Sequence, residues 1–160
     1  MSITPHTPHA TLPVLAFESA TKKTRPILAP GQLVYARVTM ANRHMDPELE
    51  CVSAATGRAD GLGPLVGGCA FTVSLGLARR LLMPAKQQGG GGGGVEVLDM
   101  LGAEGLAFET AVGRNGKVWV GGEDPRAIVL VGRALMETDD GNLGVEAQKK
   151  LVRRLLKEMK

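Results

Sequence analysis

The sequence has few aromatic residues and few cysteines, and both shortages limit what the chain can be. Aromatic residues make up 3% of its 160 residues, although 44% are hydrophobic. Its core must therefore consist mainly of leucine, valine and alanine. The cysteines, Cys51 and Cys69, are too isolated for a disulfide framework or a zinc site. We interpret them as small hydrophobic residues in a reducing compartment.

Long hydrophobic runs and a secretory signal are also missing. No apolar stretch approaches the length that spans a membrane, and the N-terminus has no basic region followed by an apolar segment. We therefore expect an intracellular chain with no membrane partner. The net charge of +3 permits binding to a polyanion without requiring it.

A pattern of catalytic residues is absent as well. The histidines His6, His9 and His44 all fall in the first third, in predicted loops, and suggest no Ser-His-Asp or Cys-His pairing. His6 and His9 have a spacing that suits a metal, but a disordered leader over residues 1–11 is the better interpretation. An acidic cluster could hold Mg²⁺, yet a polar strand face explains it more simply. These carboxylates are Asp46, Glu48 and Glu50. We predict no catalytic residues, no metal and no cofactor.

Short β-forming segments dominate the first half. They cover residues 12–17, 33–39, 48–54 and 69–75, separated by turn signals at a spacing of roughly ten residues. This spacing indicates a small barrel or sandwich, and among small barrels the OB-fold is the one that binds single-stranded nucleic acid. We assign residues 12–84 to this domain, including a short helix at 77–82.

The run of six glycines at residues 89–94 separates this domain from a second one. Such a run cannot pack, so we predict a linker or insertion over residues 85–94. Residues 95–160 then read as helix, hairpin, helix and helix, which is typical of an α+β module. Asp124 and Pro125 predict a helix start before residues 126–136, and the last segment predicts an amphipathic helix with a basic face.

The stretch FETAVGRNGKVWV, at residues 108–120, contains the most specific motif. Asn115-Gly116 predicts a tight hairpin turn, because both residues tolerate positive φ. Gly113 and Gly116 also spell the G-x-x-G of RNA-clamping KH domains. That clamp joins two helices, whereas here the motif joins two β-forming runs that include the single tryptophan, Trp119. We therefore favour a structural turn over an RNA contact.

Two basic groups are candidates for phosphate contact. Lys22, Lys23 and Arg25 form a cluster in a predicted loop, and Arg79 and Arg80 lie on the predicted short helix. Loop and helix cations of this kind either bind phosphate or are merely solvated.

Three stretches in order resemble a known family: RPILAPGQLVYARVTMANRHMDPELECVSAATGRADGLGPL, FTVSLGLARRLL and FETAVGRNGKVWV. They are similar to the cap subunits of the RNA exosome, in which an OB-fold is joined to a KH domain. The resemblance implies a non-catalytic subunit that binds RNA, contacts RNase-PH-like ring subunits and other cap subunits, and supports 3′ to 5′ RNA processing, including rRNA maturation. It implies a nuclear and nucleolar location, and a cytoplasmic one. It also implies that Gly113, Asn115, Gly116 and Trp119 form a joint between the two domains.

The chain departs from this family at its start and at the glycine run. In the family, an N-terminal domain and the opening strands of the barrel precede the segment that matches residues 12–20. We therefore expect a partial OB-fold barrel followed by a KH-type α+β domain. The alternative function is a purely structural assembly module, and a free-standing KH regulator would need its G-x-x-G between helices.

Overall fold

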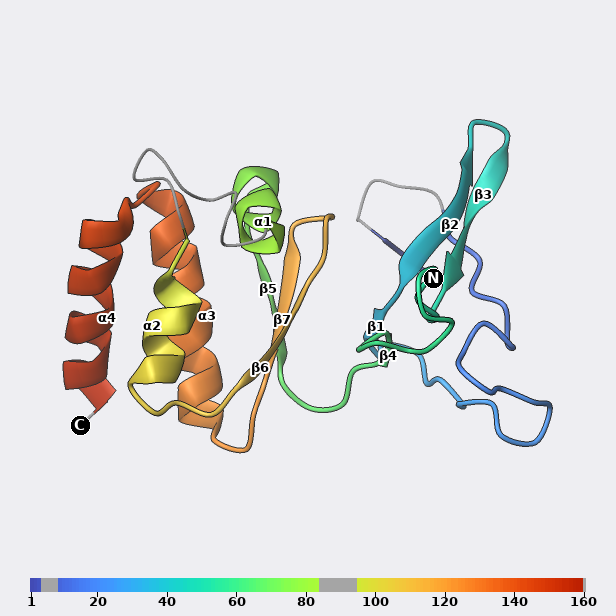
Figure 1. Ribbon diagram of the computed structural model, residues 1–160, viewed down its shortest axis with the longest axis horizontal. Helices are drawn as coiled ribbons and strands as arrows, with labels where there is room; N and C mark the ends of the chain where they lie inside the picture. The colour runs from blue at the N-terminus through green and yellow to red at the C-terminus, as the bar shows by residue number, and fades with distance from the viewer. Residues whose placement is uncertain (4–8, 84–94, 160) are drawn as a thin grey trace. The chain divides into compact units, whose positions relative to one another are not determined.

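A computed structural model describes residues 1–3, 9–83 and 95–159 of the chain. The chain forms two compact units, which comprise Met1–Val66 and Gly67–Lys160. Figure 1 labels the helices and strands of both units.

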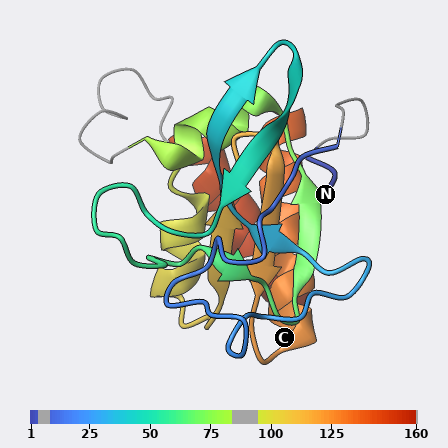
Figure 2. The same ribbon diagram turned by 90° about the vertical axis from the view of Figure 1, so that its right-hand side faces the viewer.

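The first unit contains two separate two-stranded antiparallel sheets among its described residues. Strands β2 (Arg37–Asn42) and β3 (Met45–Glu50) form a long hairpin, drawn in cyan in Figure 2. Strands β1 (Val34–Tyr35) and β4 (Gly63–Pro64) form a minimal second ladder. The polar connection expected at residues 42–47 is thus shorter than predicted, because the hairpin turns at residues 43 and 44.

The described residues at the start of the chain make backbone hydrogen bonds, within the stretch that the sequence predicts to be a disordered leader. Ala10 is buried, and its N–H donates to the carbonyl of Met1 at 2.7 Å. The Thr11 carbonyl accepts the N–H of Leu49 in β3 at 2.8 Å. Instead of the strand expected at residues 12–17, the segment makes isolated bridges at Thr11 and Phe17. His6, whose spacing from His9 would suit a metal, lies outside the described residues.

The buried hydrophobic core of the first unit is small. Among its described residues only four hydrophobic side chains are buried, and two of them are alanines. These are Ala10, Ala16, Leu49 and Cys51. Burial of apolar area is the main favourable term in folding, so this unit has little to stabilise it by itself.

In its described residues, the second unit joins a three-stranded antiparallel sheet to four helices. Its sheet has the order β5-β7-β6, and α2, α3 and α4 lie on one side of it (Figure 1). The elements are β5 (Cys69–Thr72), α1 (Leu75–Leu82), α2 (Val97–Ala103), β6 (Glu109–Val112), β7 (Lys117–Gly121), α3 (Pro125–Asp140) and α4 (Val145–Met159).

Strand β7 lies at the centre of the sheet. Its side chains point alternately into the core and toward the opposite face of the sheet. Val118 and Val120 are fully buried in the core cluster with the helices. Trp119 projects to the other face, since successive strand residues point in opposite directions. There it is flanked by Ala70 of β5 and Ala111 of β6, its partners in register.

Helix α3 begins where the sequence predicts. The Asp124 side chain accepts a hydrogen bond from the Arg126 N–H at 2.9 Å, and Pro125 occupies the first turn. The helix continues to Asp140, one turn beyond the predicted end, and the added turn still packs, since Thr138 is fully buried.

The division between the units differs from the predicted linker at residues 85–94. Strand β5 pairs with β7 through four residue pairs from Cys69 to Thr72. It therefore belongs to the second unit, as does α1 after it, and not to the OB-fold assigned to residues 12–84. The glycine run falls between α1 and α2 within the second unit, outside the described residues.

Candidate nucleic-acid interface

The basic cluster of the first unit sits on a tightly hydrogen-bonded turn. The carbonyl of Thr21 accepts the N–H of Arg25 at 3.0 Å, and the N–H of Thr21 donates to Oγ1 of Thr24 at 3.0 Å. Lys22 and Lys23 are held between these two threonines. All three cations of the cluster are exposed, so their charges are accessible to a phosphate chain.

The two arginines of the second unit lie on α1, and they differ in exposure. Ser74 caps the helix by accepting the Leu77 N–H at 3.1 Å, and Leu77 and Ala78 anchor it in the core. Arg79 is exposed, whereas Arg80 is half-buried. Arg79 is therefore the better placed of the two for an external ligand.

The G-x-N-G motif forms the turn between β6 and β7. The Gly116 N–H donates to the carbonyl of Gly113 at 3.2 Å, and the Gly113 N–H donates to the carbonyl of Lys117 at 2.8 Å. Only Gly116 has positive φ, at 76°, and Asn115 does not. The connection is thus a three-residue loop with a left-handed glycine, not the two-residue turn in which both central residues have positive φ. Asn115 acts through its side chain, whose Oδ1 accepts the Lys117 N–H at 3.2 Å.

This turn packs against the start of α1. The Val73 N–H donates to the Gly116 carbonyl at 2.9 Å. A Cβ on Gly116 would lie 2.7 Å from the Val73 carbonyl oxygen and 3.5 Å from the Leu75 side chain. Because Arg79 follows Leu75 by four residues, it lies on the same helix face as that contact.

The motif also carries two cations that were missed from the sequence. Arg114 is exposed at the tip of the turn, and Lys117 follows it, with Nζ donating to Thr72 Oγ1 at 2.6 Å. Arg114 could have been found from the sequence, because it is a basic residue inside the G-x-N-G motif itself. The structure thus brings Arg79 and the motif together, while Lys22, Lys23 and Arg25 belong to the other unit.

Trp119 is tied to the first residue of the second unit. Its indole N–H donates to the Gly67 carbonyl at 2.9 Å, and its side chain is 8% exposed. A Cβ on Gly68 would lie 2.8 Å from the indole nitrogen, so the glycine permits the close approach. The tryptophan of the motif thus fixes the backbone directly after Val66, the last residue of the first unit.

The position of the G-x-x-G motif in the fold tests the alternative of a free-standing KH regulator. In this chain they join strands β6 and β7, whereas an RNA-clamping G-x-x-G joins two helices. A free-standing KH regulator that clamps RNA through Gly113–Gly116 is therefore excluded.

No helix in the described part of the chain is long and apolar enough to cross a membrane.

Two family models match the chain in succession. Residues 1–63 match the S1 domain of exosome complex component RRP40, and residues 68–126 match the KH domain. The chain is therefore a protein in which an OB-like S1 domain is followed by a KH domain. This confirms the predicted fold class. The chain belongs to the family of the exosome complex component RRP40.

Named relatives extend this match along most of the chain. Exosome complex component rrp40 of Schizosaccharomyces pombe is 41% identical over 94% of this chain and 58% of its own length. RRP40 of Saccharomyces cerevisiae is 37% identical over 92% of this chain and 58% of its own length. RRP40 of Drosophila melanogaster is 40% identical over 79% of this chain and 50% of its own length. The chain thus spans little more than half the length of these curated relatives.

A solved structure shares the fold. A crystal structure described as an exosome complex RNA-binding protein superposes with a TM-score of 0.66 at 17% identity. The superposition covers 94% of this chain and 79% of that one.

Proposed function

We propose that the chain is a non-catalytic, RNA-binding and scaffolding cap subunit of the RNA exosome, which supports 3′ to 5′ processing and degradation of RNA, including rRNA maturation. One observation carries the proposal: an RRP40-type S1 domain is followed by a KH domain, in that order. Its partners are RNA, RNase-PH-like ring subunits and other cap subunits. It acts in the nucleus and nucleolus and also in the cytoplasm, which fluorescent tagging checks.

RNA contact comes from phosphates, with little sequence preference. In the first unit the contacting cations are Lys22, Lys23 and Arg25. In the second unit they are Arg79 and the exposed Arg114, with Arg80 contributing less because it is half-buried. Binding through a few lysines and arginines is weak and salt-dependent, since it is driven by the release of counterions.

Fluorescence anisotropy with a labelled single-stranded RNA tests this at several salt concentrations. Lys22→Glu with Lys23→Glu, and separately Arg79→Glu with Arg114→Glu, weaken binding and reduce the salt slope by about 0.7 for each lost contact. The matched control is Lys150→Glu with Lys157→Glu, which reverses two exposed charges on α4. Binding that does not change with salt, or that only the control weakens, contradicts the proposal and favours the purely structural assembly module.

The motif residues Gly113, Asn115, Gly116 and Trp119 serve as a joint between the two domains. Asn115→Ala removes the acceptor for the Lys117 N–H, so it lowers stability and assembly before it changes RNA affinity. Thermal unfolding and RNA titration of the same sample measure both effects. A variant with normal stability and incorporation but lost RNA binding would make the motif an RNA contact.

A further inference from the structure

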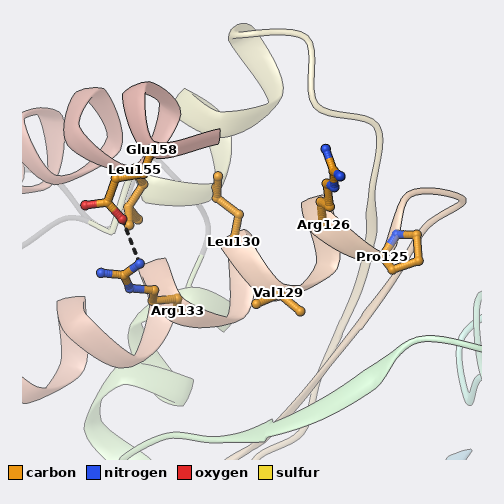
Figure 3. A pocket seen from close by; sticks show the side chains of 7 residues that line it. All are labelled: Pro125, Arg126, Val129, Leu130, Arg133, Leu155 and Glu158. Atoms are coloured by element: carbon orange, nitrogen blue, oxygen red, sulfur yellow. Dashed lines mark hydrogen bonds and ion pairs between the residues drawn. The ribbon is translucent and has the colours of Figure 1, made fainter. Parts of the chain in front are cut away.

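Helices α3 and α4 line an open groove that the proposed RNA contacts leave unused. Its volume is about 510 Å³. The first half of α3 forms one wall and the last turns of α4 the other (Figure 3). The residues that matter here are Arg126, Val129, Leu130, Arg133, Leu155 and Glu158.

The apolar part of the groove lies between two arginines of α3. Positions 126, 129, 130 and 133 have the i, i+3, i+4, i+7 spacing of a single helix face. Leu130 and Leu155 are 8% and 1% exposed and belong to the core, whereas Val129 is 61% exposed. An exposed aliphatic side chain beside a groove offers surface that a partner can bury.

The two arginines differ in how their charge is compensated. Arg133 donates to Glu137 at 2.9 Å and to Glu158 at 2.7 Å, and these carboxylates raise the pKa of its guanidinium. Arg126 forms no ion pair with any described residue. The groove therefore carries one uncompensated charge, and this charge is positive.

We infer that this groove docks a short acidic segment of a partner protein. An aliphatic side chain of the segment packs against Val129 and Leu130, and an adjacent carboxylate pairs with Arg126. This is how grooves between helices recognise peptides: an apolar anchor supplies the affinity and a charge sets the register. The inference goes beyond the proposed RNA-binding function and does not depend on it.

The lining favours a peptide over RNA. Single-stranded RNA is held by several cations together with aromatic side chains on which bases stack. The groove offers one uncompensated cation and no aromatic side chain, and Glu158 places a carboxylate in its wall. One cation without an aromatic stacking partner suits a single carboxylate beside an aliphatic group better than a chain of phosphates.

A phage-displayed random peptide library, selected against the full chain, tests the inference. We expect enriched peptides in which Asp or Glu neighbours an aliphatic residue. Arg126→Glu and Val129→Glu each weaken such a peptide at least about tenfold, which is a loss of about 1.4 kcal/mol. Met136→Glu is the matched control, because Met136 is an exposed residue of the same helix, at 46%, outside the groove. Circular dichroism confirms that each variant is folded.

Several outcomes overturn the inference. They are failure to enrich any peptide, enrichment of basic peptides, and binding that the groove variants leave unchanged. Displacement of the peptide by single-stranded RNA, or self-association of the chain through the same residues, would assign the groove to another ligand. RNA affinity is measured on the same variants. It stays unchanged in Arg126→Glu, so failure here is distinguishable from failure of the proposed function.

Discussion

Gly132, in the middle of α3, shows how one residue sets the distance between helix and sheet. A Cβ at this position would overlap the ring of Phe71 in β5. Glycine inside a helix costs about 0.5–1 kcal/mol relative to alanine. The close approach to Phe71 offsets that cost, because it lets the longest helix of the described chain lie directly on the sheet.

Gly132→Ala is therefore expected to destabilise the second unit by ~1–3 kcal/mol, because overpacking outweighs the gain in helix propensity. Chemical denaturation followed by Trp119 fluorescence measures the change. Gly102→Ala in α2 is the control, since a Cβ there meets no atom within 4 Å. It should stabilise by ~0.5–1 kcal/mol. Stabilisation by both substitutions would show that Phe71 does not limit the packing.

The Cys51 thiol gives a pH-dependent test of the first unit. It is 1% exposed, and burial, aided by the charge of Glu50, raises its pKa from an ordinary 9.0 to about 11. A raised pKa means that the folded state holds its proton more tightly. The resulting stability is full below pH 9.0 and is lost as the pH rises toward about 11.

Alkylation at pH 8 should therefore label the exposed Cys69 rapidly and Cys51 only when the first unit opens. Mass spectrometry of a Cys69→Ser variant follows Cys51 alone, and a denaturant sets the fully reactive rate. Equal labelling rates for the two thiols in the native chain would contradict the buried position of Cys51.

At the scale of elements, a carboxylate ties the start of α1 to the end of α3. Asp139 accepts hydrogen bonds from both the N–H and the hydroxyl of Ser74, each at 2.5 Å. Ser74 in turn caps α1. The position of the helix that carries Arg79 thus depends on a residue 65 positions further along the chain.

Asp139→Ala is expected to destabilise the chain by about 1 kcal/mol, a value at the low end for charged hydrogen bonds because the pair is exposed. Hydrogen exchange should speed up at the amides of Leu77 and Ala78. The control is Asp140→Ala, which removes a neighbouring exposed carboxylate that makes no side-chain hydrogen bond to a described residue. An equal effect of both substitutions would mean that charge at the helix end matters, not the tie to Ser74.

Elements that depend on local chemistry could be predicted from the sequence. Asp124 and Pro125 fixed the start of α3, and Asn115-Gly116 located the hairpin. What the sequence did not reveal depends on contacts between distant residues. Strand β5 was predicted as a strand, but its pairing with β7 spans about 50 residues and has no local signature. The contact of Gly116 with Val73 and Leu75, at the start of the helix that carries Arg79, follows from that fold. The sequence therefore predicted only part of the candidate interface.

At the scale of the molecule, the two units differ in how much apolar surface they bury. The second unit has a contiguous core of 16 buried hydrophobic residues, whereas the first has four such side chains among its described residues. We expect the first unit to unfold at lower temperature and lower denaturant concentration, because burial supplies most of the stability.

The chain provides its own probes for this prediction. Its single tryptophan, Trp119, lies in the second unit, and its single tyrosine, Tyr35, lies in the first. Trp119 fluorescence should report a higher unfolding midpoint than hydrogen exchange does for β2 and β3. A single coincident transition would show that the units unfold together.

The pairing of β5 with β7 also determines which truncated fragments of the chain can fold. A fragment that starts at Val95, after the glycine run, would lose β5 and the Gly67 carbonyl that binds the Trp119 indole. The central strand would then become an edge, open to pairing with other chains. A fragment that starts at Gly67 keeps the sheet whole. Soluble expression of the second unit alone is therefore expected from the earlier cut and aggregation from the later one.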